Sequence, residues 1–153
     1  ASLVGTSLAH AHALGASFEA TSTPYFIDIG YDPEPLVTGR TSRFEFELRD
    51  AERRLLDTYE YVWVRVLRDD KTSMAVGIHR QFFGPTTLLY TFEEGGAYSI
   101  DVSYRTKEGK EIAAALFPFV VVEEGGLLYA YIALGIGSLM LVLAGLFALH
   151  RRR

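Results

Sequence analysis

The sequence predicts an all-β protein, an antiparallel β-sandwich of about seven strands followed by one C-terminal transmembrane helix. Three observations lead to this prediction. Between residues 17 and 122, apolar residues recur at every second position in short runs separated by turn signals. No stretch of this region has the period of an amphipathic helix. Residues 127–149 then form an apolar run without a single charged residue.

Residues 127–149 are long enough to cross a membrane. As a helix rising about 1.5 Å per residue, the run extends roughly 34 Å, slightly more than a hydrocarbon core of about 30 Å. Small residues fall near one face of this helix, namely Ala133, Gly137, Ala144 and Ala148. Small residues let helices approach closely in lipid, so this face is expected to pack against partner helices.

The flanks of the run predict its direction. Arg151, Arg152 and Arg153 follow it directly, and the positive-inside bias holds such a cluster in the cytoplasm. Tyr129 and Tyr131 lie at the other end, where aromatic rings favour the headgroup level. Residues 1–126 are therefore expected outside the cytoplasm of a cell-membrane protein that crosses the bilayer once. The net charge of −4 argues against nucleic acid as a partner.

Residues 1–16 are small and apolar, with His10 and His12 as their only titratable side chains. They are typical either of the end of a secretory signal peptide, cut after Ala9, Ala11 or Ala13, or of a flexible N-terminal arm. The chain has no cysteine, so the domain depends on its own apolar core. A prokaryotic envelope protein fits this composition better than a eukaryotic cell-surface domain.

Residues 17–122 are expected to hold the strands. Alternation begins at Phe18 and continues over residues 25–31, 44–48, 61–68, 74–78, 86–92, 98–104 and 111–122. Turns are expected where Pro, Gly or charged residues cluster, at residues 32–35, 49–58, 69–71, 84–85, 93–97 and 107–110. Residues 123–126 then form a short linker of at most about 14 Å, which keeps the domain close to the bilayer.

Two details favour an immunoglobulin-like form of the sandwich. Trp63 lies mid-chain in a valine-rich strand, where such folds keep a core tryptophan. Tyr98 follows Gly96 and Ala97 and is expected to form a tyrosine corner, with its hydroxyl bonded to the backbone upstream.

Several stretches resemble small membrane-anchored envelope domains of bacteria and archaea, the YtkA-like, FixH-like and CopC-like groups. The resemblance lies in residues 61–68, 78–79, 83–92 and 94–102. It implies an immunoglobulin-like sandwich, and for some members a link to copper handling or to the assembly of membrane oxidases. CopC-like proteins bind copper through a histidine at the mature N-terminus with further His and Asp ligands. Met74 is the only methionine outside 127–149, unlike the Met-rich members, which argues against a Cu(I)-type site.

A copper site would draw on the three histidines outside residues 127–153, which are His10, His12 and His79. An N-terminal His offers its amine and imidazole together to Cu(II), and Asp28, Asp32 or Asp101 could complete the ligand set. No nucleophile elbow, phosphate loop or HExxH motif is present, so neither catalysis nor an organic cofactor is expected.

Phe82 and Phe83 form an apolar loop with Gly84 and Pro85. The two rings either mark a partner surface or close one end of the core. The leading hypothesis is a non-catalytic accessory subunit of a membrane protein complex, with other subunits and the lipid bilayer as partners. The alternative is an anchored copper-binding or copper-delivery module.

Overall fold

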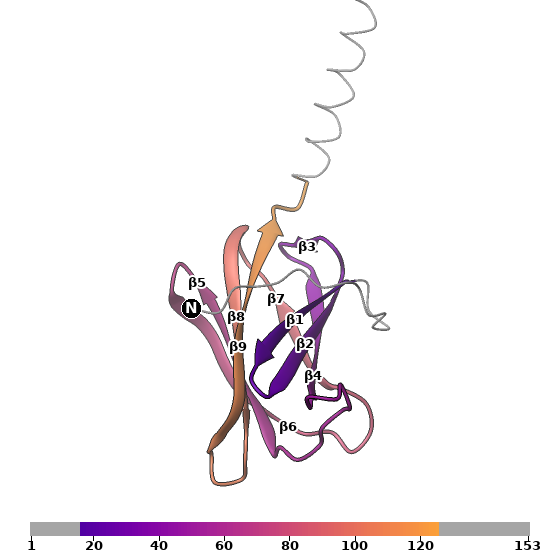
Figure 1. The fold of residues 1–153 in the computed structure, drawn as a ribbon. Helices are drawn as coiled ribbons and strands as arrows, with labels where there is room; N and C mark the ends of the chain where they lie inside the picture. The colour runs from indigo at the N-terminus through magenta and orange to yellow at the C-terminus, as the bar shows by residue number, and fades with distance from the viewer. Residues whose placement is uncertain (1–15, 126–153) are drawn as a thin grey trace, which may run out of the picture.

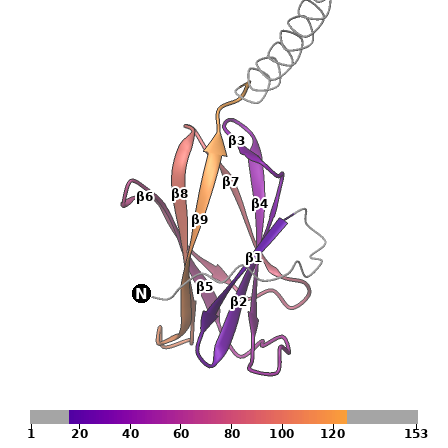
Figure 2. The same cartoon turned by 45° about the horizontal axis from the view of Figure 1, so that its top comes forward.

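The computed structural model describes residues 16–125, which form a two-layered β-sandwich (Figures 1 and 2). Its strands are β1 (Ala16–Ser22), β2 (Tyr25–Asp32), β3 (Leu36–Val37), β4 (Thr41–Arg49), β5 (Tyr61–Arg68), β6 (Lys71–His79), β7 (Thr86–Thr91), β8 (Gly96–Arg105) and β9 (Glu111–Val122). The all-β prediction is confirmed for this region. None of the residues 16–125 belongs to a helix that could span a bilayer, and residues 127–149 lie outside the described part.

The described residues make nine strands rather than about seven. The alternation that begins at Phe18 divides into two strands, because the turn at Thr23 and Pro24 reverses the chain and lets β1 pair with β2. The short strand β3 follows the turn at residues 32–35 and pairs in parallel with the end of β9. A two-residue strand is too short to leave a period-two signal in the sequence.

The strands form a four-stranded sheet in the order β1-β2-β4-β7 and a five-stranded sheet in the order β3-β9-β8-β5-β6. Every pairing except that of β3 with β9 is antiparallel. The chain passes from one sheet to the other at five connections, which are β2–β3, β3–β4, β4–β5, β6–β7 and β7–β8. This interleaving is the Greek-key pattern of immunoglobulin-like sandwiches.

The core lies between the two sheets and follows the alternation seen in the sequence. Its fully buried side chains come from every second position of β2, β4, β5 and β8, among them Ile27, Ile29, Phe44, Phe46, Leu48, Val62, Val64, Val66, Ile100, Val102 and Tyr104. Phe119 on β9 meets Tyr31 and Phe44 edge to face, with ring centroids 5.3 and 5.7 Å apart. Aromatic contacts of this kind link the two sheets.

The tyrosine corner is confirmed. Tyr98 is buried at the start of β8, and its hydroxyl donates a hydrogen bond to the backbone carbonyl of Glu94 at 2.9 Å. The prediction for Trp63 is wrong, because this ring lies half-buried on the outer face of β5, opposite Gly77. Val62 and Val64 already fill the inward positions of β5, and neighbouring residues of a strand point to opposite faces.

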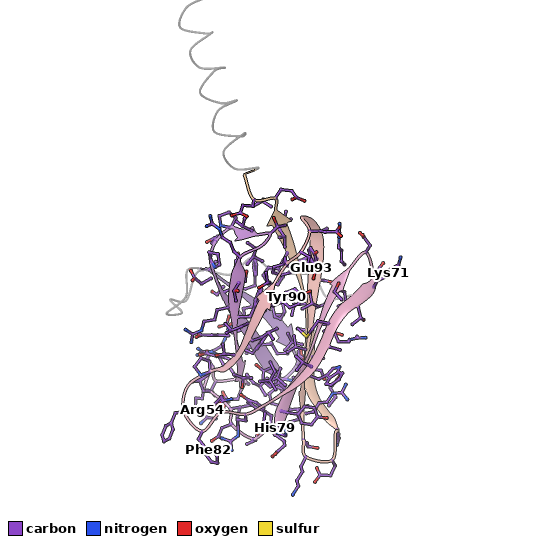
Figure 3. The ribbon with its side chains drawn as sticks, turned by 180° about the vertical axis from the view of Figure 1, so that it is seen from behind. Arg54, Lys71, His79, Phe82, Tyr90 and Glu93 are labelled. Carbon is purple, nitrogen blue, oxygen red and sulfur yellow. The ribbon has the colours of Figure 1, made fainter. Side chains whose placement is uncertain are left out.

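The sandwich has two ends with different side chains. β9 runs to the end that carries the turns at residues 32–35, 69–70 and 93–95 (Figure 1). The opposite end carries the long β4–β5 and β6–β7 connections and the β8–β9 hairpin. Figure 3 shows Arg54, His79 and Phe82 together at this second end, far from Glu93 and Lys71.

Candidate functional site

The candidate site is the β6–β7 connection, residues 80–85, which we call the aromatic loop. Phe82 is 89% exposed and Phe83 is 95% exposed. The rings therefore do not close the end of the core, which was the other interpretation of this loop. The guanidinium of Arg80 lies 5.8 Å from the centre of the Phe82 ring, within cation–π range. Two neighbouring phenylalanines in water are costly unless another surface covers them.

The two ends of the aromatic loop are fixed while its tip projects. On one side, the backbone N–H of Arg80 donates to the carbonyl of Glu60 at 3.0 Å. On the other side, Thr86 is fully buried and its hydroxyl shares a 3.0 Å hydrogen bond with the hydroxyl of Tyr59. Gly84 turns the chain with φ of +80°, a conformation that glycine adopts without strain. The rings are thus presented from anchored backbone.

The neighbouring β4–β5 connection, residues 50–60, is held by its first residue. The Asp50 carboxylate accepts hydrogen bonds from the backbone N–H groups of Glu52 and Arg54, at 3.0 and 2.9 Å. The backbone N–H of Arg54, followed by its guanidinium, holds the pKa of Asp50 below its usual range. Leu55, 63% exposed, follows this turn and adds a third apolar side chain to the same end of the sandwich.

A cleft of about 270 Å³ lies between the two connections. Leu55, Leu56 and Tyr59 line one side of it, and Phe82 and Pro85 line the other. Charged groups stand among these apolar side chains, contributed by Glu47, Asp57 and Arg80. A concavity lined by both apolar and polar side chains is suited to receive a protruding side chain of a partner.

His79 lies at the end of β6 close to the aromatic loop (Figure 3). Its Nδ1 is 3.7 Å from a carboxylate oxygen of Glu60, and both side chains are well exposed. The expectation that Asp101 could join His79 in a ligand set is wrong. The strand pairing places Asp101 beside Arg65, four residues along β5 from the partner of His79, a separation of about 13 Å along the strand direction.

The other two predicted acidic ligands are also separated from His79. Asp28 and Asp32 belong to β2 in the opposite sheet, and Asp28 is buried on the outer face of that sheet near Arg49. Across residues 16–125, no three His, Asp or Glu side chains are arranged to hold a metal ion. The described donors therefore do not fit a copper site by themselves.

The copper alternative depends on His10 and His12, which lie outside the described residues. Mass spectrometry of the native N-terminus is the measurement that decides it, because cleavage after Ala13 removes both histidines. The remaining predicted site residues also lie outside residues 16–125. They are the small helix face of Ala133, Gly137, Ala144 and Ala148, the interface tyrosines Tyr129 and Tyr131, and the basic tail of Arg151, Arg152 and Arg153.

Two parts of the site were not predicted from the sequence. Leu55 was assigned only to a charged connecting turn, and the cleft was not foreseen. A leucine pair inside a charged run is the signal that could have drawn attention to residues 55–56. The cleft itself forms between two connections that are separated in the chain by the whole of β5 and β6, so no local pattern reports it.

The comparisons with known proteins give structural likeness at low identity. No protein-family model and no curated protein matches the chain. One similar solved structure is the soluble domain of PmoD from Methylocystis sp. ATCC 49242 (Rockwell), which is 13% identical. That match covers 67% of this chain and 95% of the other, with a TM-score of 0.49.

A second similar structure is the CARDB domain of the PF1109 protein from Pyrococcus furiosus, solved in complex with di-metal ions. It is 16% identical, and the match covers 69% of this chain and all of that chain, with a TM-score of 0.39. Neither value assigns a family or an activity to this protein.

Proposed function

We propose that this protein is a non-catalytic accessory subunit of a membrane protein complex. Residues 127–149 anchor it in the cell membrane, the β-sandwich lies outside the cytoplasm, and the aromatic loop binds the extracytoplasmic part of another subunit. The exposure of Phe82 and Phe83 beside the cleft is the observation that carries this proposal.

The position of the aromatic loop indicates the kind of partner. β9 ends at one end of the sandwich, and the chain continues from there toward residues 127–149. The aromatic loop lies at the other end (Figure 3). An anchored domain would therefore hold Phe82 and Phe83 away from the lipid. A protein surface above the bilayer is in reach of these rings, and the headgroups beneath the domain are not.

The chemistry of the patch fits recognition by a protein. Phe82, Phe83 and Leu55 supply apolar area, while Arg80 supplies positive charge at its edge. Aromatic residues and arginine are the residue types enriched where binding energy concentrates in interfaces. The partner is expected to offer an apolar surface with acidic groups at its rim. The cleft would take one of its side chains.

Site-specific photo-cross-linking in native membranes tests this proposal. A photoreactive phenylalanine analogue replaces Phe83 in one variant and Lys107 in the control, since the β8–β9 hairpin lies at the same end of the sandwich. We expect the Phe83 variant to cross-link to one discrete subunit of a membrane complex and the Lys107 variant not to do so. The same adduct should migrate with that complex on a native gel.

Replacing both rings separates binding from folding. Phe82→Ser with Phe83→Ser should leave the free energy of unfolding unchanged to within about 0.5 kcal/mol, because both side chains are already in water. The same pair should abolish co-purification with the partner subunit. The proposed function is rejected if the Phe83 variant cross-links to no subunit and the double variant still co-purifies with the complex as the natural chain does.

A further inference from the structure

The outer faces of the two sheets differ in chemistry. The four-stranded sheet presents charged residues to its outer side, with Glu19, Asp28, Glu45, Glu47 and Arg49 on adjacent strands. The outer side of the five-stranded sheet carries more apolar and small side chains, and its charges include Arg65 and Asp101 at the centre and Arg105 at the end of β8. On β9 this side carries Leu116 and Val120, which are 56% and 71% exposed, with Pro118 between them.

The apolar outer face alternates between large and small side chains from strand to strand. In the order β9-β8-β5-β6, β9 carries large groups, β8 small ones, β5 large ones and β6 small ones. The large groups are Leu116, Pro118 and Val120 on β9 and Tyr61, Trp63 and Leu67 on β5; the small ones are Ala97, Ser99 and Ser103 on β8 and Ser73, Ala75 and Gly77 on β6, with the charged Arg65 and Asp101 at the centre and Arg105 at the end of β8. The face therefore has two ridges and two grooves.

This alternation is complementary to itself. A two-fold axis parallel to the strands, passing between β5 and β8, would bring each ridge of one copy over a groove of the other. β5 would then face β8 of the second copy, and β9 would face β6. Residues that pair across the sheet lie at the same height along the strands, and the axis keeps that height. Leu67 of one copy would therefore meet Ser99 of the other, and Leu116 of one copy would meet Ala75 of the other.

The charged residues of the face are also placed compatibly with this two-fold axis. Arg65 and Asp101 stand side by side at its centre, and the Nε of Arg65 donates to the Asp101 carboxylate at 2.9 Å. Under the two-fold axis, Arg65 of one copy lies opposite Asp101 of the other. The result is an alternating group of four charges in which no like charges face each other.

The face also has the size and direction that a dimer needs. Four strands about 4.8 Å apart and about eight residues long cover roughly 500 Å² in projection, and protruding side chains bring the accessible area closer to the roughly 800 Å² that a partner buries in a standard interface. An axis parallel to the strands points both β9 strands the same way. Two chains anchored in one bilayer require this arrangement.

From these observations we propose that the chain forms a two-fold symmetric dimer through the outer face of its five-stranded sheet. The common direction of the two copies rests on the membrane-anchored placement of the proposed function. The aromatic loops remain free at the far end, so the dimer would present two copies of the partner surface. Packing of two sheet faces at a distance of about 10 Å is the ordinary spacing of stacked sheets.

The first test compares two leucines on opposite outer faces. Leu116→Asp on β9 and Leu89→Asp on β7 place the same charge at similarly exposed positions. For the full-length chain in mild detergent, light scattering should give a dimer for the natural sequence and for Leu89→Asp. Leu116→Asp should raise the apparent dissociation constant more than about tenfold, because its carboxylate would be buried without a partner.

Trp63 provides a second readout without substitution, because it is the single tryptophan of the chain and lies on the proposed interface. Its emission should shift to longer wavelength as the protein is diluted through the dissociation constant. Leu116→Asp should show the shifted spectrum at concentrations at which the natural chain is still a dimer. An emission that is independent of concentration in a sample that does dissociate would overturn the proposal.

A charge exchange tests the contact between copies. Arg65→Glu and Asp101→Arg each place like charges across the axis and should be monomeric alone. Mixed together, they should form a heterodimer, because the two introduced charges are opposite in sign and face each other across the axis. The natural Asp101 of the first variant then faces the natural Arg65 of the second. Repair of an internal ion pair alone cannot produce rescue by mixing.

Three results would overturn the dimer: a monomeric natural chain, a dimer that Leu116→Asp leaves intact, or no heterodimer from the mixed charge variants. The outcome is independent of the partner cross-link at Phe83. A dimer without that cross-link would reject the proposed function alone, and a monomer that still cross-links from Phe83 would reject the dimer alone.

Discussion

The hydroxyl of Tyr98 donates a hydrogen bond to the backbone carbonyl of Glu94, 2.9 Å away, and so ties the start of β8 to the turn before it. Replacing Tyr98 by Phe removes this bond and keeps the ring. We expect the free energy of unfolding to fall by about 1 kcal/mol, the usual contribution of one hydrogen bond. Urea denaturation of the natural chain and the variant measures the difference.

Tyr104 is the control for that substitution. Its side chain is fully buried, burial raises its pKa well above the usual value, and among the described residues its hydroxyl has no hydrogen-bond partner. Tyr104→Phe should therefore leave stability unchanged or raise it slightly, since it removes an unpaired polar atom. A loss as large as that of Tyr98→Phe would show that the Tyr104 hydroxyl is hydrogen-bonded and would contradict its use as a control.

Tyr59 and Thr86 form a buried pair that fixes the base of the aromatic loop. Tyr59→Phe and Thr86→Val each leave the other hydroxyl unpaired and should each cost about 1–2 kcal/mol. The double variant leaves no orphan hydroxyl, so its loss should be smaller than the sum of the two by at least about 0.5 kcal/mol. A double-mutant cycle in urea tests this, and additive losses would show that the bond does not contribute.

Asp50 makes stability depend on pH. Its pKa is lowered in the folded chain, first by the backbone N–H of Arg54 and then by the Arg54 guanidinium. The ionised Asp50 therefore contributes its full stabilisation at pH values above the pKa that Asp50 has in the unfolded chain. This stabilisation is lost as the pH falls through the lower pKa of Asp50 in the folded chain. Asp50→Asn should be less stable than the natural chain at neutral pH, and the two should converge in acid. Denaturation midpoints measured across this range check the convergence.

Gly84 and Gly77 should respond in opposite ways to alanine. Gly84 has φ of +80°, so Gly84→Ala is strained although its Cβ would meet no atom within 4 Å, and it should cost about 1 kcal/mol. At Gly77 the added Cβ would touch the Trp63 ring at 3.5 Å, an ordinary contact, in a strand of ordinary backbone. Gly77→Ala should be neutral or slightly stabilising in thermal unfolding. Equal losses at both positions would contradict this reasoning.

Sequence reasoning succeeded where the signal was local. The alternation of Val62, Val64 and Val66 placed them in the core, and the same parity placed Trp63 outside. The prediction for Trp63 rested on analogy with immunoglobulin folds, which keep a core tryptophan on a similar strand. The alternation of its own strand instead places the ring on the outer face. The tyrosine corner was predictable because Tyr98 and Glu94 are close together in the chain.

The candidate site was predictable only in part. Phe82 and Phe83 stood out as an apolar loop, but either exposure or burial was compatible with the sequence. The wrong expectation that Asp101 could lie beside His79 has a different cause. Which residues lie side by side depends on the pairing of β5 with β6 on one edge and with β8 on the other, and β8 comes from a distant segment of the chain. No local pattern in the sequence reveals that strand register.

By itself, the sequence determined where most of the longer strands form, which side of each is apolar, and that residues 127–149 carry no charge. The tertiary structure alone decided that Leu55 joins Phe82 beside one cleft, and that the ridges and grooves of four strands lie in an order complementary to themselves. The physical reason is that side-chain direction along a strand follows from backbone geometry between neighbours. Strand order and register follow from contacts between distant segments, which form only when the whole core closes.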